Sequence, residues 1–162
     1  MTCTGSASPE TGSPTPPQEQ RLVANRLRPT LARTGVLSAL EDAKPGCLDA
    51  SQMHRILSRQ FGGLRLGSIY RALNDLWMAG ILVRTEGAHG RALYAVKPDT
   101  SSARYDTLRC HCGARLAFVD DPALRERLRW LACTEGFALD AEPVFSVTTT
   151  CAKCRQSGEG TL

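Results

Sequence analysis

Two close pairs of cysteines constrain what this chain can fold into more than any other feature. The pairs are Cys110-x-Cys112 and Cys151-x-x-Cys154. Paired thiolates on tight turns are the usual way in which a protein supplies the four tetrahedral ligands of a structural zinc. The stretch between the pairs is predicted to form strand, helix and strand, and it is too small for a large core. We therefore expect one zinc ion to hold the two ends of a small domain together.

The first cysteine pair leaves two alternatives open. Cys110 and Cys112 are one residue closer than the usual knuckle spacing, so His111 could replace one thiolate as a ligand, and Gly113 follows where the turn needs a positive φ. The competing interpretation is a redox-active pair of thiols. Such a pair usually sits where a strand runs into a helix, whereas Cys151 follows three threonines, which disfavours that interpretation.

The composition is that of a globular chain with a flexible start. Residues 1–18 are rich in Pro, Ser, Thr and Gly and are predicted to be a disordered tail. This segment has no apolar stretch preceded by positive charge, so no secretory signal is expected. No apolar run approaches the roughly 20 residues that span a bilayer, so no membrane partner is predicted. Seven cysteines, an odd number, argue against a closed disulfide framework and favour the cytoplasm.

The positive charge is concentrated in the first half of the chain. Residues 19–97 contain twelve Lys/Arg against six Asp/Glu, whereas residues 98–162 contain eight against nine. A basic segment joined to a nearly neutral one is typical of a nucleic-acid-binding domain with a separate second module.

The segment 19–97 is predicted to be a winged helix-turn-helix domain. A short helix over 20–26 precedes a second helix capped by Thr30, and Asp49 with Gln52 forms a capping box for a third. Ser68 is predicted to begin a fourth helix, which buries a stripe of apolar residues.

Two strands follow the fourth helix. Gly80 ends that helix, and the segments 81–85 and 92–96 are predicted to pair as a hairpin around the loop 86–91. Helices followed by such a hairpin are typical of a winged helix.

The second half is predicted to be a small α/β domain. A polar hinge over 98–103 leads into a domain over 104–155, followed by a tail over 156–162. A strand pair is expected within 108–119 and a returning strand over 137–147.

A helix is predicted between those strands. Asp121 should cap it, with Pro122 at its first position. Cys133 lies within this helix and is expected to pack in the core.

The fourth helix has side chains suited to reading DNA. Arg71 can donate to guanine O6 and N7, the ring of Tyr70 can contact a thymine methyl group, and Asn74 lies one turn further on. Arg28 and Arg33 flank the second helix cap, where they could reach phosphates or the minor groove. The set predicts contact with double-stranded DNA.

These motifs together resemble the ferric uptake regulator (Fur) superfamily. Arg28-Pro-Thr-Leu-Ala-Arg33 is similar to its opening signature, and Ser68-Ile-Tyr-Arg-Ala-Leu73 to its recognition helix. The cysteine pairs are similar to its two structural zinc pairs, the first shortened by one residue. The resemblance covers residues 20–154, with the motifs in family order.

The resemblance implies an α+β fold, with an N-terminal winged helix and a C-terminal α/β dimerisation domain that holds structural zinc. It also implies a cytoplasmic homodimer that binds a palindromic operator and usually represses metal-homeostasis or stress genes. The DNA-contacting residues that it implies are Arg28, Tyr70 and Arg71. Ser68, at the predicted start of the same helix, is a further candidate for DNA contact.

The sequence departs from the family at the sensory metal site. The family's His-His-Asp-His run corresponds to residues 104–107, which keep only Asp106. A ligand near the third helix corresponds to Cys47, one near the wing to Ala95, and one in the C-terminal domain to Glu142.

Two outcomes remain open for this site. The chain has only three histidines, and a sensory site of nitrogen and oxygen ligands needs more of them. The protein would then bind DNA constitutively or respond through thiols. Alternatively, four residues could form an altered sensory site: Cys47, His89, Asp106 and Glu142.

The resulting hypothesis is a DNA-binding transcription regulator, a repressor rather than an enzyme. No phosphate loop, no nucleophile with a histidine base and no suitable carboxylate pair is present. The alternatives are a thiol-redox protein that uses the cysteine pairs and an interaction module that shares the fold but does not bind DNA.

Overall fold

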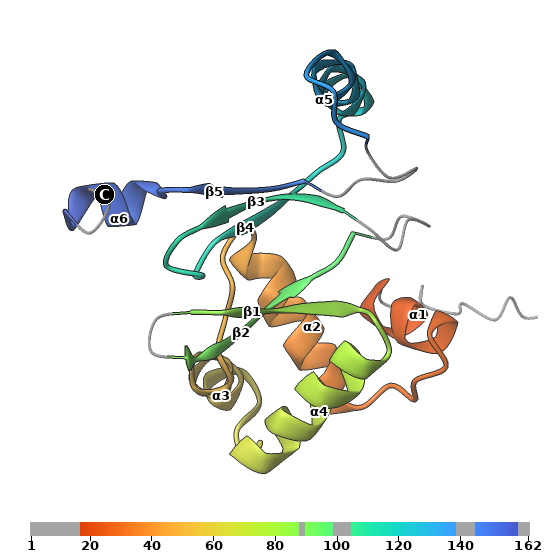
Figure 1. Ribbon diagram of the computed structural model, residues 1–162. Helices are drawn as coiled ribbons and strands as arrows, with labels where there is room; N and C mark the ends of the chain where they lie inside the picture. Colours follow the sequence, from red (N-terminus) through yellow and green to blue (C-terminus); the bar gives the residue numbers. More distant parts are fainter. Residues whose placement is uncertain (1–16, 88–89, 99–104, 139–144, 159–162) are drawn as a thin grey trace, which may run out of the picture.

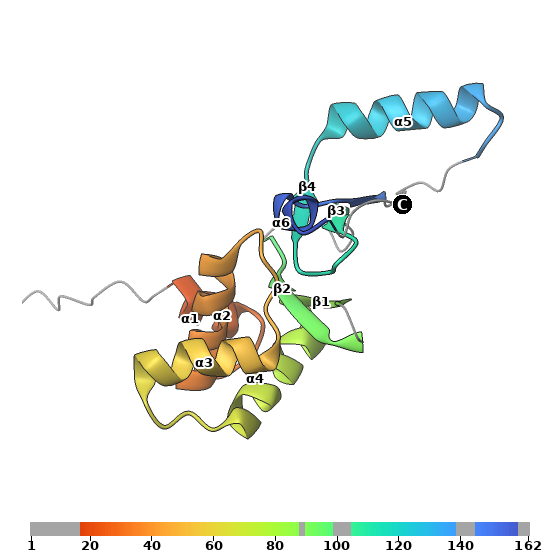
Figure 2. The same ribbon diagram turned by 90° about the vertical axis from the view of Figure 1, so that its left-hand side faces the viewer.

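The computed structural model describes residues 17–87, 90–98, 105–138 and 145–158 (Figure 1). Most of both predicted tails, the hinge after Pro98 and the middle of the wing loop lie outside these ranges. The described chain forms a helical part followed by a hairpin, and then a smaller part built on a three-stranded sheet (Figures 1 and 2).

Four helices form the first part. They are α1 (Pro17–Ala24), α2 (Leu31–Ala43), α3 (Ala50–Phe61) and α4 (Leu66–Met78). The predicted caps of α2 and α3 are confirmed, because Thr30 accepts from the Arg33 amide and Asp49 forms the capping box with Gln52.

The predicted starts of two helices are wrong. Helix α1 begins at Pro17 rather than at residue 20, because the fixed φ of proline suits the first helical position. Helix α4 begins at Leu66 rather than at Ser68, whose amide already donates to the carbonyl of Arg65 inside the first turn.

The core of the first part lies between α2, α3, α4 and the hairpin. Strands β1 (Leu82–Glu86) and β2 (Ala92–Val96) pair antiparallel and cover the helices. Helix α4 buries residues that recur every three or four positions, which turns its opposite side outward. The buried residues of this helix are Ile69, Ala72, Leu73 and Leu76.

The second part has the predicted strand pair, helix and strand, and it ends in a short helix that was not predicted, α6 (Ala152–Gln156). Strand β3 (Asp106–Cys110) lies between β4 (Leu116–Val119), antiparallel to it, and β5 (Ser146–Thr149), parallel to it. Helix α5 (Pro122–Thr134) is capped by Asp121 as predicted. The predicted strand over 137–147 is wrong in extent: Phe137 and Ala138 are not in a strand, and residues 139–144 lie outside the described residues.

Helix α5 stands away from the sheet (Figure 2). None of its residues is buried, and Leu124, Trp130 and Leu131 expose 46%, 63% and 42% of their surface. The prediction that Cys133 lies in the core is therefore wrong, since its side chain is exposed. The physical reason is that no other element among the described residues covers the apolar side of this helix.

A short segment after α2 joins the two parts. The Cys47 amide donates to the Ala114 carbonyl at 2.9 Å, and the Leu116 amide donates to the Pro45 carbonyl at 3.0 Å. One residue further along, Leu48 and Tyr94 exchange two backbone hydrogen bonds. The small sheet and the hairpin are thus both bonded to this segment.

Candidate metal centre and nucleic-acid interface

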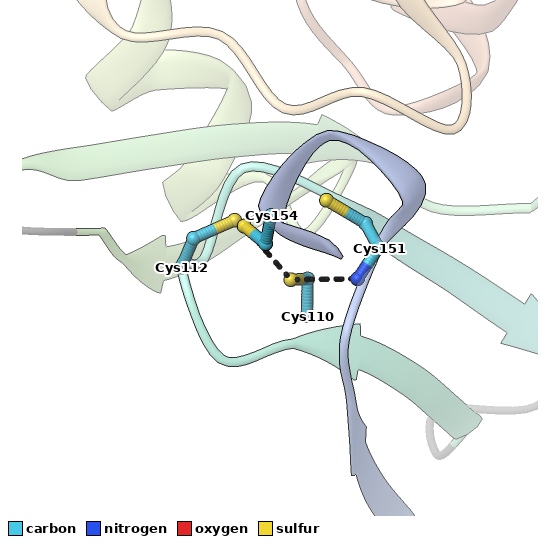
Figure 3. Close-up of side chains that lie close together, drawn as sticks. All are labelled: Cys110, Cys112, Cys151 and Cys154. Atoms are coloured by element: carbon cyan, nitrogen blue, oxygen red, sulfur yellow. Dashed lines mark hydrogen bonds between the residues drawn. The ribbon is translucent and has the colours of Figure 1, made fainter. Parts of the chain in front are cut away.

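The four cysteines of the two pairs meet at one point (Figure 3). Cys110 ends β3, Cys112 lies in the turn after it, and Cys151 and Cys154 belong to the start of α6 (Ala152–Gln156). Their sulfur atoms all lie within 4.8 Å of one another, and those of Cys110 and Cys154 are 3.8 Å apart. A zinc ion about 2.3 Å from each sulfur in a tetrahedron requires sulfurs about 3.8 Å apart. The spacing of the cluster therefore fits zinc.

The backbone supports a thiolate in this cluster. The Cys151 amide donates to the Cys110 sulfur at 3.2 Å. Burial acts to raise the pKa of Cys110, but hydrogen bonds from the backbone and side chains of Cys112 and Cys151 outweigh it and lower the pKa to about 6. Hydrogen bonding with Cys112, together with burial, raises the pKa of Cys154. Proton loss from the cluster is thus favoured first at Cys110.

Two sequence-based alternatives are affected by this geometry. His111 is exposed, and the cluster of potential ligands is formed by the four thiols without it. The argument that Cys151 is not at a strand-to-helix start is wrong, because this residue follows β5 and is the N-cap of α6. What disfavours a separate redox pair is instead the convergence of all four sulfurs.

The turn that follows Cys112 packs tightly against the wing hairpin. Gly113 has a φ of +72°, and a Cβ atom there would lie 2.3 Å from the Glu86 carbonyl oxygen and 2.7 Å from the Gly87 Cα. The Thr85 hydroxyl also donates to the Gly113 carbonyl at 3.4 Å. The turn that carries the cysteine cluster is therefore in contact with the wing hairpin of the first part of the same chain.

Substitution of Gly113 by alanine should destabilise the fold more than the same change at Gly136. Both glycines have a positive φ, but an added Cβ meets nothing within 4 Å at Gly136. An alanine held in the left-handed backbone conformation costs roughly 1–2 kcal/mol. Gly136→Ala therefore measures this backbone cost alone, without a steric clash. Urea unfolding should show a larger loss for Gly113→Ala, and equal losses would contradict the tight contact with the wing.

The predicted DNA-reading residues of α4 lie on one exposed side. Ser68, Arg71 and Asn74 are exposed, and Tyr70 exposes 53% of its surface. This stripe lies opposite the buried side of the helix, and the caps and turns of the first part leave it uncovered. It can therefore enter a groove of a nucleic acid.

The two arginines near the second helix cap differ. Arg28 is exposed, whereas Arg33 donates to the Asp75 carboxylate at 2.7 Å and to the Arg28 carbonyl at 2.7 Å. Asp75 belongs to α4, so Arg33 ties the start of α2 to this helix. The sequence pattern could not reveal that partner, which lies 42 residues away.

The residues of the altered sensory site are not brought together within the described chain. Asp106 is buried and accepts from Arg125 at 2.9 Å and from the Phe145 amide at 3.0 Å. Cys47 is buried at the junction of the two parts, where burial raises the pKa of its thiol to about 11 despite a hydrogen bond with Thr85. His89 and Glu142 lie outside the described residues. Within the described ranges, the four-cysteine cluster is the one group of three or more possible ligands.

A winged helix with an uncovered polar stripe on α4, joined to a cluster of four cysteines that could hold a metal ion, is the arrangement expected of a metal-binding regulator that binds DNA. The model of the ferric uptake regulator family matches residues 24–143, and the chain therefore belongs to this family. Its members are transcription regulators and not enzymes.

Individual relatives agree with the family assignment. The ferric uptake regulation protein of Cupriavidus metallidurans is 27% identical over 127 residues, which are 78% of this chain and 86% of that protein. The ferric uptake regulator of Pseudomonas aeruginosa with manganese is 20% identical, with a TM-score of 0.58 over 84% of this chain and 98% of the other. A zinc uptake regulator complexed with zinc and DNA is 20% identical, with a TM-score of 0.54 over 87% and 92%. The two structures show that the fold is shared.

No helix in the described ranges is both long enough and apolar enough to cross a lipid bilayer.

Proposed function

We propose that this protein is a cytoplasmic, homodimeric repressor that binds a twofold-symmetric DNA operator through α4 and carries a structural zinc. The observation that carries the proposal is the exposed stripe of Ser68, Tyr70, Arg71 and Asn74 on the last helix before the wing. Arg71 reads a base edge, Tyr70 packs against a thymine methyl group, and Asn74 and Ser68 hold the helix on the adjacent bases or phosphates.

The two arginines near α2 have different roles in this proposal. Arg28, exposed beside the cap, contacts the DNA backbone. Arg33 holds Asp75 and thereby positions α4, since its guanidinium is occupied in the free protein. The relative solved with zinc and DNA supports DNA as the ligand of this fold.

The thiolate cluster holds zinc in a structural role. Cys110, Cys112, Cys151 and Cys154 supply all four tetrahedral positions, which leaves no open position for a substrate or a water molecule. The ion, when bound, joins the end of β3 to α6 and so closes the small sheet.

The homodimer is supported by two surfaces that the described residues of a single chain leave uncovered. The apolar side chains of α5 are exposed, and β5 is an edge strand with all four residues exposed, including Val147 at 50%. An exposed apolar helix next to an open strand edge is unfavourable in water unless another subunit covers it. Twofold symmetry then places two copies of α4 on the two halves of the operator.

DNA binding does not depend on a sensory metal in this proposal. The Asp106 carboxylate, which the resemblance assigns to the sensory site, is already neutralised by the Arg125 guanidinium at 2.8 Å. Both of its oxygens accept hydrogen bonds from the protein, so a cation there would compete with Arg125 for the carboxylate. An altered site at Cys47, His89, Asp106 and Glu142 is therefore the weaker alternative.

Selection from a random pool of duplex DNA tests the proposed function. The zinc-loaded full chain should enrich a twofold-symmetric sequence whose half-sites are centred about 10 base pairs, or a multiple of that, apart. Failure to enrich any sequence over several rounds at moderate salt would contradict sequence-specific binding.

Added Fe²⁺ or Mn²⁺ should change the affinity for the selected duplex by less than twofold. The reason is that the Asp106 carboxylate is already paired with Arg125 and is not free to bind either ion. Fluorescence anisotropy of a labelled duplex measures the affinity, with the zinc-loaded protein titrated in the presence and in the absence of each ion. A tenfold tightening by either ion would show that a sensory site survives.

A further inference from the structure

The end of α4 and the wing hairpin are joined by a cation–π contact. The guanidinium carbon of Arg84, on β1, lies 5.9 Å from the centre of the Trp77 ring, on α4. Trp77 exposes 41% of its surface, and Arg84 is exposed. Arg84 forms no ion pair with any carboxylate of the described residues. Its N–H donors are therefore available to a ligand while the guanidinium lies over the ring.

A cavity of about 480 Å³ opens beside this pair. It lies between the last turn of α4 and the hairpin, and its lining is mostly polar. The lining residues are Trp77, Arg84, Thr85, Glu86, Gly90 and Ala92.

The cavity continues the exposed stripe of α4. Trp77 follows Tyr70 by seven residues, or two turns, so the two side chains lie on the same side of the helix, about 10 Å apart along its axis. The major groove of DNA is about 12 Å wide, so a strand that borders the groove entered by Tyr70 passes near Trp77 and Arg84.

We propose that Trp77 and Arg84 form a phosphate-binding subsite for the backbone of duplex DNA. Arg84 donates hydrogen bonds to a phosphate oxygen, and Trp77 is a positioning residue that holds the guanidinium flat and pointed out of the cavity. This inference rests on the proposed function, because it requires that α4 binds DNA.

Glu86 should affect the binding of a phosphate in the direction opposite to Arg84. Its carboxylate lines the same cavity and lies two residues from Arg84 on the exposed side of β1. A negative charge there repels a phosphate, so Glu86→Gln should tighten binding, whereas Arg84→Ala should weaken it.

The experiment uses the two tryptophans of the chain, Trp77 and Trp130. In the full zinc-loaded protein with Trp130→Phe, Trp77 is the only indole, and its fluorescence should change when the selected duplex is added. In the Trp77→Phe protein, only Trp130 on α5 remains, and its fluorescence should stay constant although DNA binds.

The salt dependence of binding gives a second readout. Arg84→Ala should weaken binding about tenfold at low salt and lower the slope of log K against log[salt] by about one. Trp77→Ala should weaken binding less, and Trp77→Phe should restore most of the loss, because phenylalanine still offers a ring face.

The outcomes separate this inference from the proposed function. If the Trp130→Phe protein binds DNA but the Trp77 signal and the salt slope of Arg84→Ala are unchanged, the subsite is wrong and DNA binding by α4 stands. If no duplex is bound by the unmodified protein, both proposals fail. Thermal unfolding of each variant shows whether a lost affinity reflects a lost fold, and Arg84→Lys, which keeps the charge without the planar fork, should bind with intermediate affinity.

Discussion

Replacement of Cys154 by serine should remove the metal and unfold the second part of the chain. Cys154 is 4% exposed, and its sulfur lies 3.8 Å from that of Cys110, so no solvent ligand can easily replace it. The small sheet has little core of its own, and structural zinc contributes about 10–16 kcal/mol to the folding of isolated zinc-finger peptides. The zinc content should fall from about one ion per chain to well below half an ion per chain, as measured by metal analysis. Circular dichroism should show a loss of secondary structure.

Cys133→Ser is the matched control for this prediction. Cys133 is exposed on α5 and lies outside the cluster, so its replacement should leave zinc content and unfolding unchanged. A stable, fully folded Cys154→Ser protein with no bound metal would contradict the structural role of zinc. Zinc loss caused equally by Cys133→Ser would contradict the assignment of the four ligands.

Replacement of Arg71 by alanine should cost about 1–3 kcal/mol of specific DNA binding and leave the fold intact. The side chain is exposed on α4 and supports none of the buried stripe, so its removal should not affect stability. Affinities for the selected duplex and for one with altered half-sites should converge in the variant, because a base-reading contact is lost. Fluorescence anisotropy at fixed salt measures both affinities.

The control for Arg71→Ala is Arg127→Ala, which removes an exposed arginine from α5. This variant should keep the preference for the selected duplex. If both variants lower the affinity for every duplex to the same extent, Arg71 contributes only charge and does not read bases.

The elements that could be predicted from the sequence are those defined by neighbouring residues. Thr30, Asp49 with Gln52, and Asp121 cap helices through hydrogen bonds to amides three residues away, so the sequence contains the whole motif. Ser68 was misleading because a good capping residue can also lie inside a first turn.

The features that could not be predicted depend on distant partners. Arg125 lies 19 residues from Asp106, and no periodicity indicates that they pair. Gly113 approaches Glu86 across the boundary between the two parts, which a prediction made for each part separately cannot show. For Cys133, the prediction of a core position failed because an amphipathic helix pattern does not say whether the same chain or another covers it.

The four-cysteine cluster could be predicted from spacing, but its ligand set could not. The shortened Cys110-x-Cys112 pair leaves His111 as a possible ligand in the sequence, and only the convergence of four sulfurs in space, with His111 exposed, separates the two ligand sets. The tyrosine and arginine of α4 were predicted to face outward because the apolar positions of the helix leave only that side free.

The most direct test of DNA binding by α4 is hydroxyl-radical oxidation of the protein's side chains with and without the selected duplex, followed by mass spectrometry. Tyr70 exposes 53% of its surface in the free chain, and Trp130, on α5 and away from α4, serves as the internal reference. The account predicts that DNA strongly slows the oxidation of Tyr70 and leaves that of Trp130 on α5 unchanged. Unaltered oxidation of Tyr70 in a fully bound complex would show that DNA lies on another surface and would contradict the account.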